Sequence, residues 1–398
     1  MPTHGAHDSI FTGRTRLLAV TTEPPPNVAR EALVVAIDVA PLLSPLTGVG
    51  AAVEQIIGAM AGEPDISLKP YACSFRGALQ PGTTRLPLPA AVSQRLWAHF
   101  RGPRVDRWLR PAQVIHGTNY TVAPSRLPRV VTVYDCWFLR NPSQATADVV
   151  RAGQVLRRAI ESGAVVHTCS HATADSVREL LHASRVEVIP FAALPITGTA
   201  DETKQIPPVA ELDGVPYILA LGTLERRKNL PRLVAAFGQI AHAHPEVRLA
   251  LVGADGDDRQ AINAAIDNQH ADARERIMCT GRIDESAKRW FLEHAQVLAY
   301  PSLDEGFGFP LLEAMRYELP VVASTSGSIP EVAGDAAILV EAHDVTALAD
   351  ALQRALTDSS VRQGLIEAGR HRINHYSWPE TAAGLAGLYR QLAHEGSR

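Results

Sequence analysis

Two glutamates, Glu305 and Glu313, flank a glycine-rich turn and are the residues of this sequence best placed to do chemistry. The turn is Gly306-Phe307-Gly308, and glycine lets a backbone approach a ligand closely and present its N–H groups to an anion. Carboxylates beside such amides repel phosphate, but they accept hydrogen bonds from sugar hydroxyls. The segment therefore predicts a site for a sugar nucleotide.

The elements around this turn are expected to be a strand and a helix. The apolar run 297–300 is typical of a buried parallel strand, and Pro301 closes it. Pro310 suits the first turn of a helix whose positive end would face the same ligand. An alternative is that Glu313 is an ordinary exposed helix residue and that Glu305 is only a favourable charge near a helix start.

The segment 281–344 resembles the retaining glycosyltransferases of family four, also called glycosyl transferases group 1. The resemblance extends over most of residues 33–390, and its motifs are specific together rather than singly. Besides the two glutamates, the motifs are Gly281-Arg-Ile-Asp284, Pro320-Val-Val-Ala-Ser324, Ser328-Ile-Pro-Glu-Val-Ala-Gly-Asp335 and Tyr217-Ile-Leu-Ala-Leu-Gly-Thr-Leu-Glu-Arg-Arg-Lys-Asn-Leu230.

Apolar runs alternate with helical stretches twice along the chain, which predicts two α/β domains, each with a doubly wound parallel sheet. The resemblance implies the GT-B fold, in which two such Rossmann-like domains face each other across a cleft and a C-terminal helix crosses back to the first. The expected strands are 33–38, 114–116, 130–134, 165–168, 186–189, 217–221, 248–252, 277–279, 297–300, 321–322 and 337–340. The expected divisions are a flexible tail (1–32), an acceptor-side domain (33–191), a linker (192–215), a nucleotide-sugar domain (216–375) and a crossover helix with its tail (376–398).

The resemblance also implies roles for individual residues. Arg227 and Lys228 would neutralise the donor diphosphate, although four consecutive charged residues could also be a solvated loop. Glu305 would hold hydroxyls of the donor sugar and the developing positive charge of its ring. The other residues expected to bind the donor are Gly50, Gly222, Thr223, Ile283 beside the base, Gly306, Phe307, Gly308, and Glu313 on the ribose.

Tyr134 and Asp135 depart from the family pattern, which often has a His-Asp pair there. A phenol can donate a hydrogen bond, but it is a poor base near neutral pH because its ordinary pKa is about 10. We therefore expect Tyr134 and Asp135 to contact the sugar or the acceptor. His116 lies at another strand end, and a structural role is favoured for it.

Composition excludes several classes of protein. A formal net charge of -4 argues against a general nucleic-acid binder, which needs a basic face. The four cysteines form no C-x-x-C pair, which indicates neither a zinc site nor a disulfide framework and favours the cytoplasm.

No secretory signal or membrane span is expected, and Asp255-Gly-Asp257 is interpreted as a polar turn rather than a metal site. The mixture of cations and aromatics in 95–110 suits peripheral contact with a membrane, or equally a solvated face.

These observations predict a retaining hexosyltransferase that moves a sugar from a nucleotide diphosphate donor to a hydroxyl of a glycan, a lipid-linked acceptor or a small molecule, without a cofactor or metal. The segments Gly-Thr-x4-Lys-Asn and Ser-Ile-Pro-Glu-Val-Ala-Gly are most similar to mannosyl- and rhamnosyltransferases, which favours GDP-mannose. Two alternatives stay open, a sugar-nucleotide epimerase of the same fold and a non-catalytic nucleotide-sugar binder. A cytoplasmic location, with possible contact at the inner membrane face, is expected.

Overall fold

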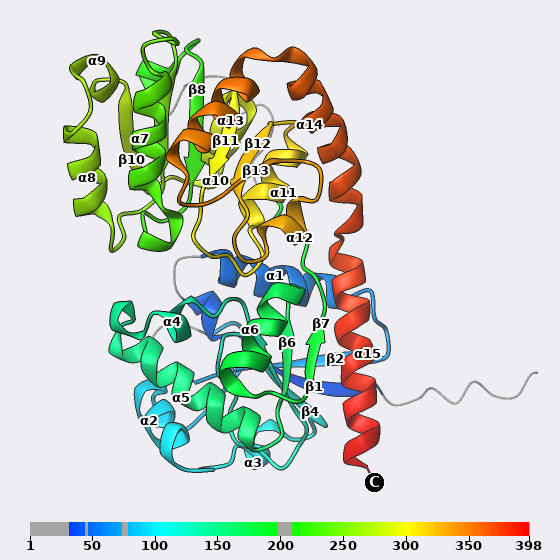
Figure 1. Cartoon of the computed structure of the whole chain (residues 1–398). Coiled ribbons are helices and arrows are strands. Elements are labelled where there is room, and N and C mark those ends of the chain that lie inside the picture. Colours follow the sequence, from blue (N-terminus) through cyan, green and yellow to red (C-terminus); the bar gives the residue numbers. More distant parts are fainter. Residues whose placement is uncertain (1–31, 44–46, 74–78, 197–208, 398) are drawn as a thin grey trace, which may run out of the picture. The chain divides into compact units, whose positions relative to one another are not determined.

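The computed structural model describes residues 32–43, 47–73, 79–196 and 209–397, which belong to one compact unit, Ala32–Arg398 (Figure 1). The predicted tail, apart from residue 32, and residues 197–208 of the predicted linker lie outside the described residues. The beginning of that linker is packed rather than loose, because Ala192, Ala193 and Leu194 are buried and Trp378 Nε1 donates to the Ala193 carbonyl over 3.0 Å.

The first domain contains a seven-stranded parallel sheet in the order β3-β2-β1-β4-β5-β6-β7. Its strands are β1 (Leu33–Asp38), β2 (Ile66–Ala72), β3 (Thr84–Arg85), β4 (Val114–Gly117), β5 (Arg129–Val133), β6 (Val165–Thr168) and β7 (Val186–Val188). Strands β2 and β3 were not predicted. Lys69 and Pro70 interrupt the apolar run of β2, and proline in a strand normally argues against that assignment.

Helices cover both faces of this sheet. They are η1 (Ala40–Leu43), α1 (Gly48–Met60), α2 (Ala90–His99), α3 (Asp106–Leu109), α4 (Trp137–Arg140), η2 (Pro142–Gln144), α5 (Ala147–Glu161) and α6 (His171–Leu181), and η3 (Ala210–Leu212) precedes the second domain. Side chains alternate along a strand, so Val35 and Ile37 of β1 pack in the core that includes α1 and α15, whereas Ala36 packs in the core that includes α2 and α5.

The second domain contains a six-stranded parallel sheet in the order β10-β9-β8-β11-β12-β13. Its strands are β8 (Tyr217–Leu221), β9 (Arg248–Val252), β10 (Ile277–Gly281), β11 (Val297–Tyr300), β12 (Val321–Ser324) and β13 (Ile338–Val340). The strand order reverses between β8 and β11. Ligands of open α/β sheets bind outside the carboxyl ends of the strands at such a reversal.

The helical elements of the second half are η4 (Arg226–Lys228), α7 (Leu230–Ile240), α8 (Arg259–Asp267), α9 (Ala271–Arg274), α10 (Glu285–His294), α11 (Phe309–Arg316), α12 (Ile329–Ala333), α13 (Val345–Thr357), α14 (Ser359–Arg372), η5 (Ile373–His375) and α15 (Trp378–Gly396). Helix α7 packs on the sheet through one apolar face, whose residues Leu233, Val234, Phe237 and Ile240 are all buried. None of the described helices is both long and apolar enough to cross a membrane.

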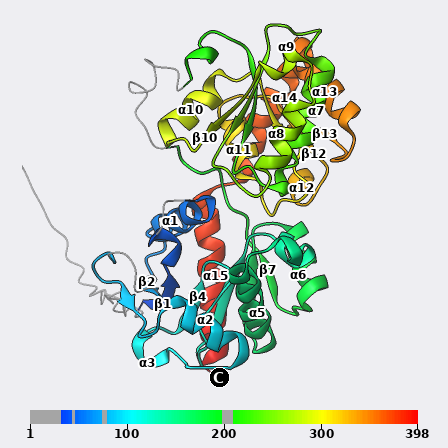
Figure 2. The same ribbon diagram turned by 90° about the vertical axis from the view of Figure 1, so that its left-hand side faces the viewer.

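Helix α15 packs on the first domain, as the resemblance implied. Figures 1 and 2 show it in red beside β1 and β4, and it contacts both strands and α1. Leu385 and Leu392 are buried in its interface. Arg390 at its surface forms ion pairs with Glu63 and Asp65 of the first domain, both at 2.6 Å.

A buried chain of polar groups fastens α15 to the first sheet. His167 Nε2 lies 3.0 Å from the Ile189 carbonyl, which can only accept, so this nitrogen carries the proton. The Thr132 hydroxyl then donates to His167 Nδ1 at 2.9 Å and accepts from His116 Nε2 at 2.7 Å. Tyr389 Oη of α15 completes the chain by donating to His116 Nδ1 at 2.6 Å.

The two histidines of this hydrogen-bond chain, His116 and His167, have a structural role. Burial lowers the pKa of His116 to about 3, with a further contribution from His167, and burial lowers the pKa of His167 to about 4. Both rings are therefore neutral near physiological pH, and every ring nitrogen already has a partner. The structural role favoured for His116 agrees with this placement.

We expect Tyr389→Phe to lower the free energy of unfolding by about 1–3 kcal/mol, because it leaves His116 Nδ1 buried without a donor. Urea unfolding followed by circular dichroism measures the change. Tyr317→Phe, at a half-buried tyrosine of the second domain, is the matched control and should change stability by less than about 0.5 kcal/mol. Equal stability of the two variants would show that the hydrogen bond to His116 contributes nothing.

Candidate active site

The basic loop follows β8 and folds as the short helix η4, which includes Arg227 and Lys228. Asn229 closes it in the left-handed conformation, with φ of 58°. The Asn229 side-chain amide donates to the carbonyls of Pro301, at 2.9 Å, and Ala342, at 2.7 Å. The Leu303 N–H donates to the Arg227 carbonyl at 2.7 Å, so the basic loop is fixed to the loop that follows β11.

Glu305 is buried between the two cations of this loop. One carboxylate oxygen pairs with the Arg227 guanidinium, and the other accepts from Lys228 Nζ at 2.7 Å. Lys228 Nζ also donates to Tyr300 Oη at 2.9 Å and lies 4.6 Å from the centre of that ring. The alternative in which the four charged residues form a solvated loop does not describe Arg227 and Lys228, since neither is an exposed residue.

The ionisation of this cluster follows from burial and pairing. Burial by itself would raise the pKa of Glu305, but Arg227 and Lys228 together outweigh it and hold the pKa at about 2. Burial lowers the pKa of Lys228, although Glu305 opposes that shift. Glu305 is therefore a carboxylate near neutral pH, and each of its oxygens must share a cation's hydrogen bond with any sugar hydroxyl that it binds.

Gly306 joins this cluster to the first domain. A Cβ at Gly306 would lie 1.5 Å from the Tyr134 carbonyl oxygen, so only glycine fits. The Gly306 carbonyl accepts from Ser170 Oγ at 2.7 Å and Thr173 Oγ1 at 3.2 Å, both at the start of α6. Glu331, from the predicted Ser-Ile-Pro-Glu motif, also caps α6, by accepting from the amides of residues 171 and 172.

The other two residues of the glycine turn, Phe307 and Gly308, have different roles, one in packing and the other in backbone conformation. Gly308 has φ of +88°, a conformation that favours glycine, and it precedes α11. The Phe307 side chain is buried in an aromatic cluster with Phe191, Phe309 and Tyr376, so only its backbone could meet a donor as predicted.

Glu313 is 1% exposed, which rules out the alternative of an ordinary exposed helix residue. Lys288 Nζ of α10 donates to its carboxylate at 2.7 Å, and burial raises the pKa of Glu313. Ile283, predicted to contact the base, is half-buried just before α10.

Gly222 and Thr223 lie where β8 meets the basic loop. Gly222 has φ of +137°, and a Cβ there would lie 3.3 Å from Lys228 Cε. Thr223 is exposed. Gly50, in the first domain, lies in the first turn of α1, where its amide donates to Thr47 Oγ1 at 3.4 Å.

The predicted contact of the Tyr134 phenol with a sugar does not fit its placement. Its hydroxyl donates to the Thr118 carbonyl at 3.0 Å inside the core, its ring packs on Phe191, and burial raises its pKa. Asp135 is different, because it lines a cavity and its carboxylate accepts from the Trp137 amide at 3.1 Å.

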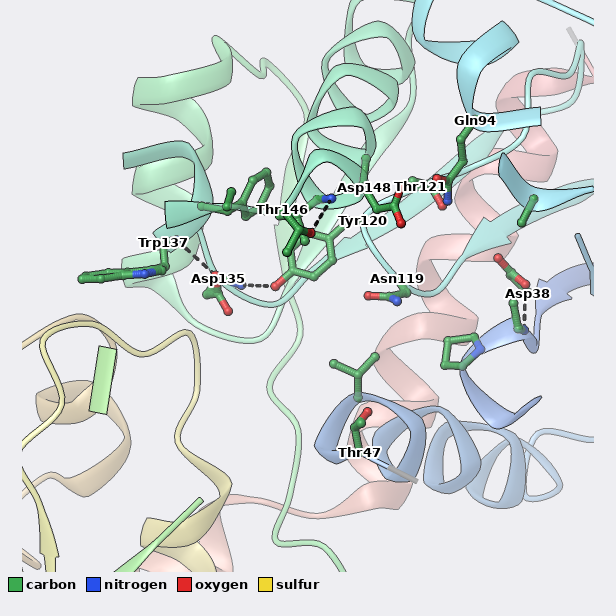
Figure 3. Close-up of a pocket in the computed structure, with 18 of the residues that line it drawn as sticks. Asp38, Thr47, Gln94, Asn119, Tyr120, Thr121, Asp135, Trp137, Thr146 and Asp148 are labelled. Carbon is green, nitrogen blue, oxygen red and sulfur yellow. Dashed lines mark hydrogen bonds between the residues drawn. The ribbon is translucent and has the colours of Figure 1, made fainter. Parts of the chain in front are cut away.

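A cavity of about 800 Å³ opens at the carboxyl ends of the first-domain strands. Figure 3 shows Asp38, Asn119, Tyr120, Asp135 and Trp137 around it. The second domain contributes Glu225, Arg227, Gly256 and Asp257 to the wall, so the cavity reaches the basic loop.

Asp38, Asn119 and Trp137 were not predicted as site residues. Asp38 ends a predicted strand, and Asn119 and Trp137 each follow another, so the rule that ligands bind at carboxyl ends would have selected all three. Tyr300 was also not predicted as a site residue, although it ends β11 and the same rule would have selected it.

We expect Gly306→Ala to reduce any turnover about 100-fold, because the added methyl group must push Glu305 and its two cations away from the first domain. Gly364→Ala is the control, since a Cβ there meets nothing within 4 Å. Steady-state kinetics of both variants measures the effect. Unchanged turnover in Gly306→Ala would mean that the close approach to Tyr134 is not needed for activity.

Comparisons with known proteins show which families and folds this chain is similar to. The family model for glycosyl transferases group 1 matches residues 201–372. O-antigen chain mannosyltransferase B of Escherichia coli is 26% identical over 377 residues, which cover 88% of this chain and 98% of that protein. Phosphatidyl-myo-inositol mannosyltransferase of Mycobacterium leprae (strain TN) is 32% identical over 185 residues, covering 46% of this chain and 48%, about half, of that protein.

Similarity to solved structures extends over both domains. The structure of sucrose-phosphate synthase from Thermosynechococcus elongatus has a TM-score of 0.70 at 22% identity, and the match covers 90% of this chain and 99% of that one. This likeness confirms the predicted arrangement of two Rossmann-like domains. Residues 201–372 thus match the glycosyl transferases group 1, and the likeness of both domains to solved structures shows that the chain has the GT-B fold.

Proposed function

We propose that this protein is a retaining glycosyltransferase that transfers a hexose from a nucleotide diphosphate sugar to an acceptor hydroxyl. The observation that carries the proposal is the pair of cations, Arg227 and Lys228, placed by the buried Glu305 where the strand order of the second sheet reverses. Glu305 is the buried carboxylate between the two cations, and Glu225, which is more exposed, lies 3.5 Å from Arg227 at the edge of the cluster. The two cations suit the charge of a leaving diphosphate.

The proposed reaction uses these charges during bond breaking. The bond between the anomeric carbon and the diphosphate oxygen breaks, and its electron pair goes to that oxygen, where Arg227 and Lys228 stabilise the negative charge. The acceptor oxygen bonds to the anomeric carbon on the same face, and its proton passes to the leaving phosphate. Glu305 holds the cations in place and offers its remaining lone pairs to sugar hydroxyls.

The donor that we favour is GDP-mannose. Its support is the resemblance of the Gly222-to-Asn229 and Ser328-to-Gly334 segments to mannosyltransferases, together with the two mannosyltransferases named above as similar proteins. Glu313 and Ile283 are proposed to bind the ribose and the base. Glu313 would have to share its carboxylate with Lys288.

We also propose that the reaction needs no metal, because the two cations supply positive charge beside Glu305. Asp255 and Asp257 are engaged within the chain, the first with Arg259 at 2.7 Å and the second with the Arg226 amide at 3.0 Å. Unchanged turnover after dialysis against a chelator would support this part of the proposal.

We expect nucleoside diphosphates, with GDP the strongest, to raise the melting temperature of the full chain. A ligand at about 100 times its Kd adds about 2.7 kcal/mol of stability. Lys228→Ala should abolish most of this shift and lower turnover with GDP-mannose at least about 100-fold, since it removes a charge that acts on the leaving group.

The matched control is Arg226→Ala, in the same loop, because Arg226 is exposed and its backbone rather than its side chain contacts Asp257. It should keep both nucleotide binding and turnover. Normal transfer by Lys228→Ala would contradict the proposed site, and exchange of a sugar proton without transfer would indicate an epimerase instead.

Peripheral contact with an anionic membrane is the second part of the proposal. Phe100, at the end of α2, is 63% exposed, and it lies among exposed arginines of the segment 95–110. These are Arg95, Arg101, Arg104, Arg107 and Arg110. Trp97 is buried and Trp108 is half-buried, so the exposed Phe100 is the residue expected to enter the bilayer interface. We place the protein in the cytoplasm at the inner membrane face, and the free state of its four cysteines suits that compartment.

We expect the protein to pellet with phosphatidylglycerol vesicles but not with phosphatidylcholine vesicles. Arg101→Glu should weaken this binding at least about fivefold, because each arginine near an anionic surface contributes about 1 kcal/mol. Arg354→Glu, which changes an exposed arginine of the second domain in the same way, is the control. Equal binding to both kinds of vesicle would contradict membrane contact through this surface.

A further inference from the structure

We propose that the first-domain part of the cavity binds an uncharged sugar residue of the acceptor, held by Asp38, Tyr71 and Trp97, and that it excludes phosphorylated sugars. This inference rests on the proposed function, because it assigns the acceptor of the same reaction. It goes further by naming the chemical class of that acceptor and residues that select it.

The charge of the cavity wall argues against a phosphate group. Among the described lining residues, the carboxylates are Asp38, Asp135, Asp148, Glu225 and Asp257, and the one cation is Arg227. That cation is already paired with Glu305 and Glu225. Asp148, at the exposed edge, is paired with Arg151 at 2.7 Å, which neutralises one carboxylate without offering a new cation to a ligand. A phosphorylated sugar would therefore meet like charges.

Two buried polar groups in the wall have no hydrogen-bond partner among the described residues. They are Tyr71 Oη and Trp97 Nε1, on side chains that are 1% and 5% exposed. Buried polar groups are normally paired, and an unmade hydrogen bond of this kind costs about 1–3 kcal/mol. Both residues line the cavity, so we propose that their free donors bind an oxygen of the ligand.

Asp38 supplies the complementary acceptor. It ends β1, lines the same cavity and has one carboxylate oxygen 2.9 Å from the Ala40 amide. Burial raises its pKa to about 6, because that single backbone hydrogen bond only partly offsets the loss of water. A sugar hydroxyl can donate to Asp38 and accept from Tyr71 at once, which satisfies both groups. A phosphate dianion can only accept hydrogen bonds, so it cannot donate to Asp38. It would also place negative charge next to that carboxylate.

The remaining wall also suits a saccharide. Gln94, Asn119 and Thr121 offer amide and hydroxyl groups, and the aromatic rings of Tyr120, Trp137 and Phe138 can cover the C–H face of a pyranose. The volume of about 800 Å³ lies within the range of pockets that enclose drug-sized ligands, so it has room for more than one sugar residue.

The test measures binding of two matched sets of probes to the full chain by saturation-transfer NMR, with GDP present. The neutral set is the methyl α-glycosides of mannose, glucose and galactose, and the charged set is the 6-phosphates of the same hexoses. We expect at least one neutral glycoside to bind at least about tenfold more tightly than its phosphate counterpart, a difference of about 1.4 kcal/mol.

Substitutions then locate the site. Tyr71→Phe and Asp38→Asn should each weaken binding of the neutral glycoside about tenfold while the Kd for GDP stays the same. Tyr317→Phe, outside the cavity, is the control and should change neither. Gln94→Arg should raise the affinity for the phosphates, because it places a cation in the wall, and this gain stays informative if a buried substitution impairs folding.

Three results would overturn the inference. They are equal or tighter binding of the phosphates, no binding of any neutral glycoside, or unchanged glycoside binding in both Tyr71→Phe and Asp38→Asn. Failure of the wild type to bind any nucleoside diphosphate would instead count against the proposed function. GDP binding without glycoside binding would count against this inference alone.

Discussion

The burial of one carboxylate between two cations is the constraint on which this structure depends. Glu305 could not stay ionised inside the protein without Arg227 and Lys228, and those two cations would repel each other without Glu305. The arrangement holds two cations at the ends of β8 and β11 when no ligand is bound. In the proposed reaction, a departing diphosphate would meet cations that are already in position, which would lower the cost of reorganisation.

The same loop also ties the two domains together. Gly306 follows Glu305 directly and contacts the Tyr134 carbonyl and the start of α6. These contacts fix the charge cluster against the first domain. Phe191 extends this contact through an aromatic cluster that includes Phe307, Phe309 and Trp378. Helix α15 begins at Trp378 and ends on the first sheet, where Tyr389 binds His116. The charge cluster and the interdomain packing are therefore parts of one continuous core.

The two domains present opposite chemistry to a ligand. The second domain supplies the cations of the basic loop, whereas the first supplies mainly carboxylates, amides and aromatic rings around its cavity. This asymmetry would suit the two substrates of the proposed reaction, since a charged leaving group and a polyhydroxylated acceptor need different partners. The Tyr134 hydroxyl supports the core rather than the cavity. The proposed reaction, in which the leaving phosphate takes the proton, would require no base at that position.

Much of the fold, and the nearness of Glu305 to Arg227 and Lys228, could be predicted from the sequence, because local features determine the strands and the loops that follow them. Apolar runs specified β1, β6, β8, β9 and β11, and the spacing of Glu305 and Glu313 around two glycines placed the site at a helix start. Strand β2 was not predicted because Lys69 and Pro70 break its apolar pattern, and it is a strand only because it pairs with β1. Burial and partners were decided by tertiary structure alone. No local pattern shows that Glu313 meets Lys288, that the Tyr134 phenol turns inward, or that Asp38, Tyr71 and Trp97 share a cavity, since these contacts join residues far apart in the chain or depend on which way a side chain faces.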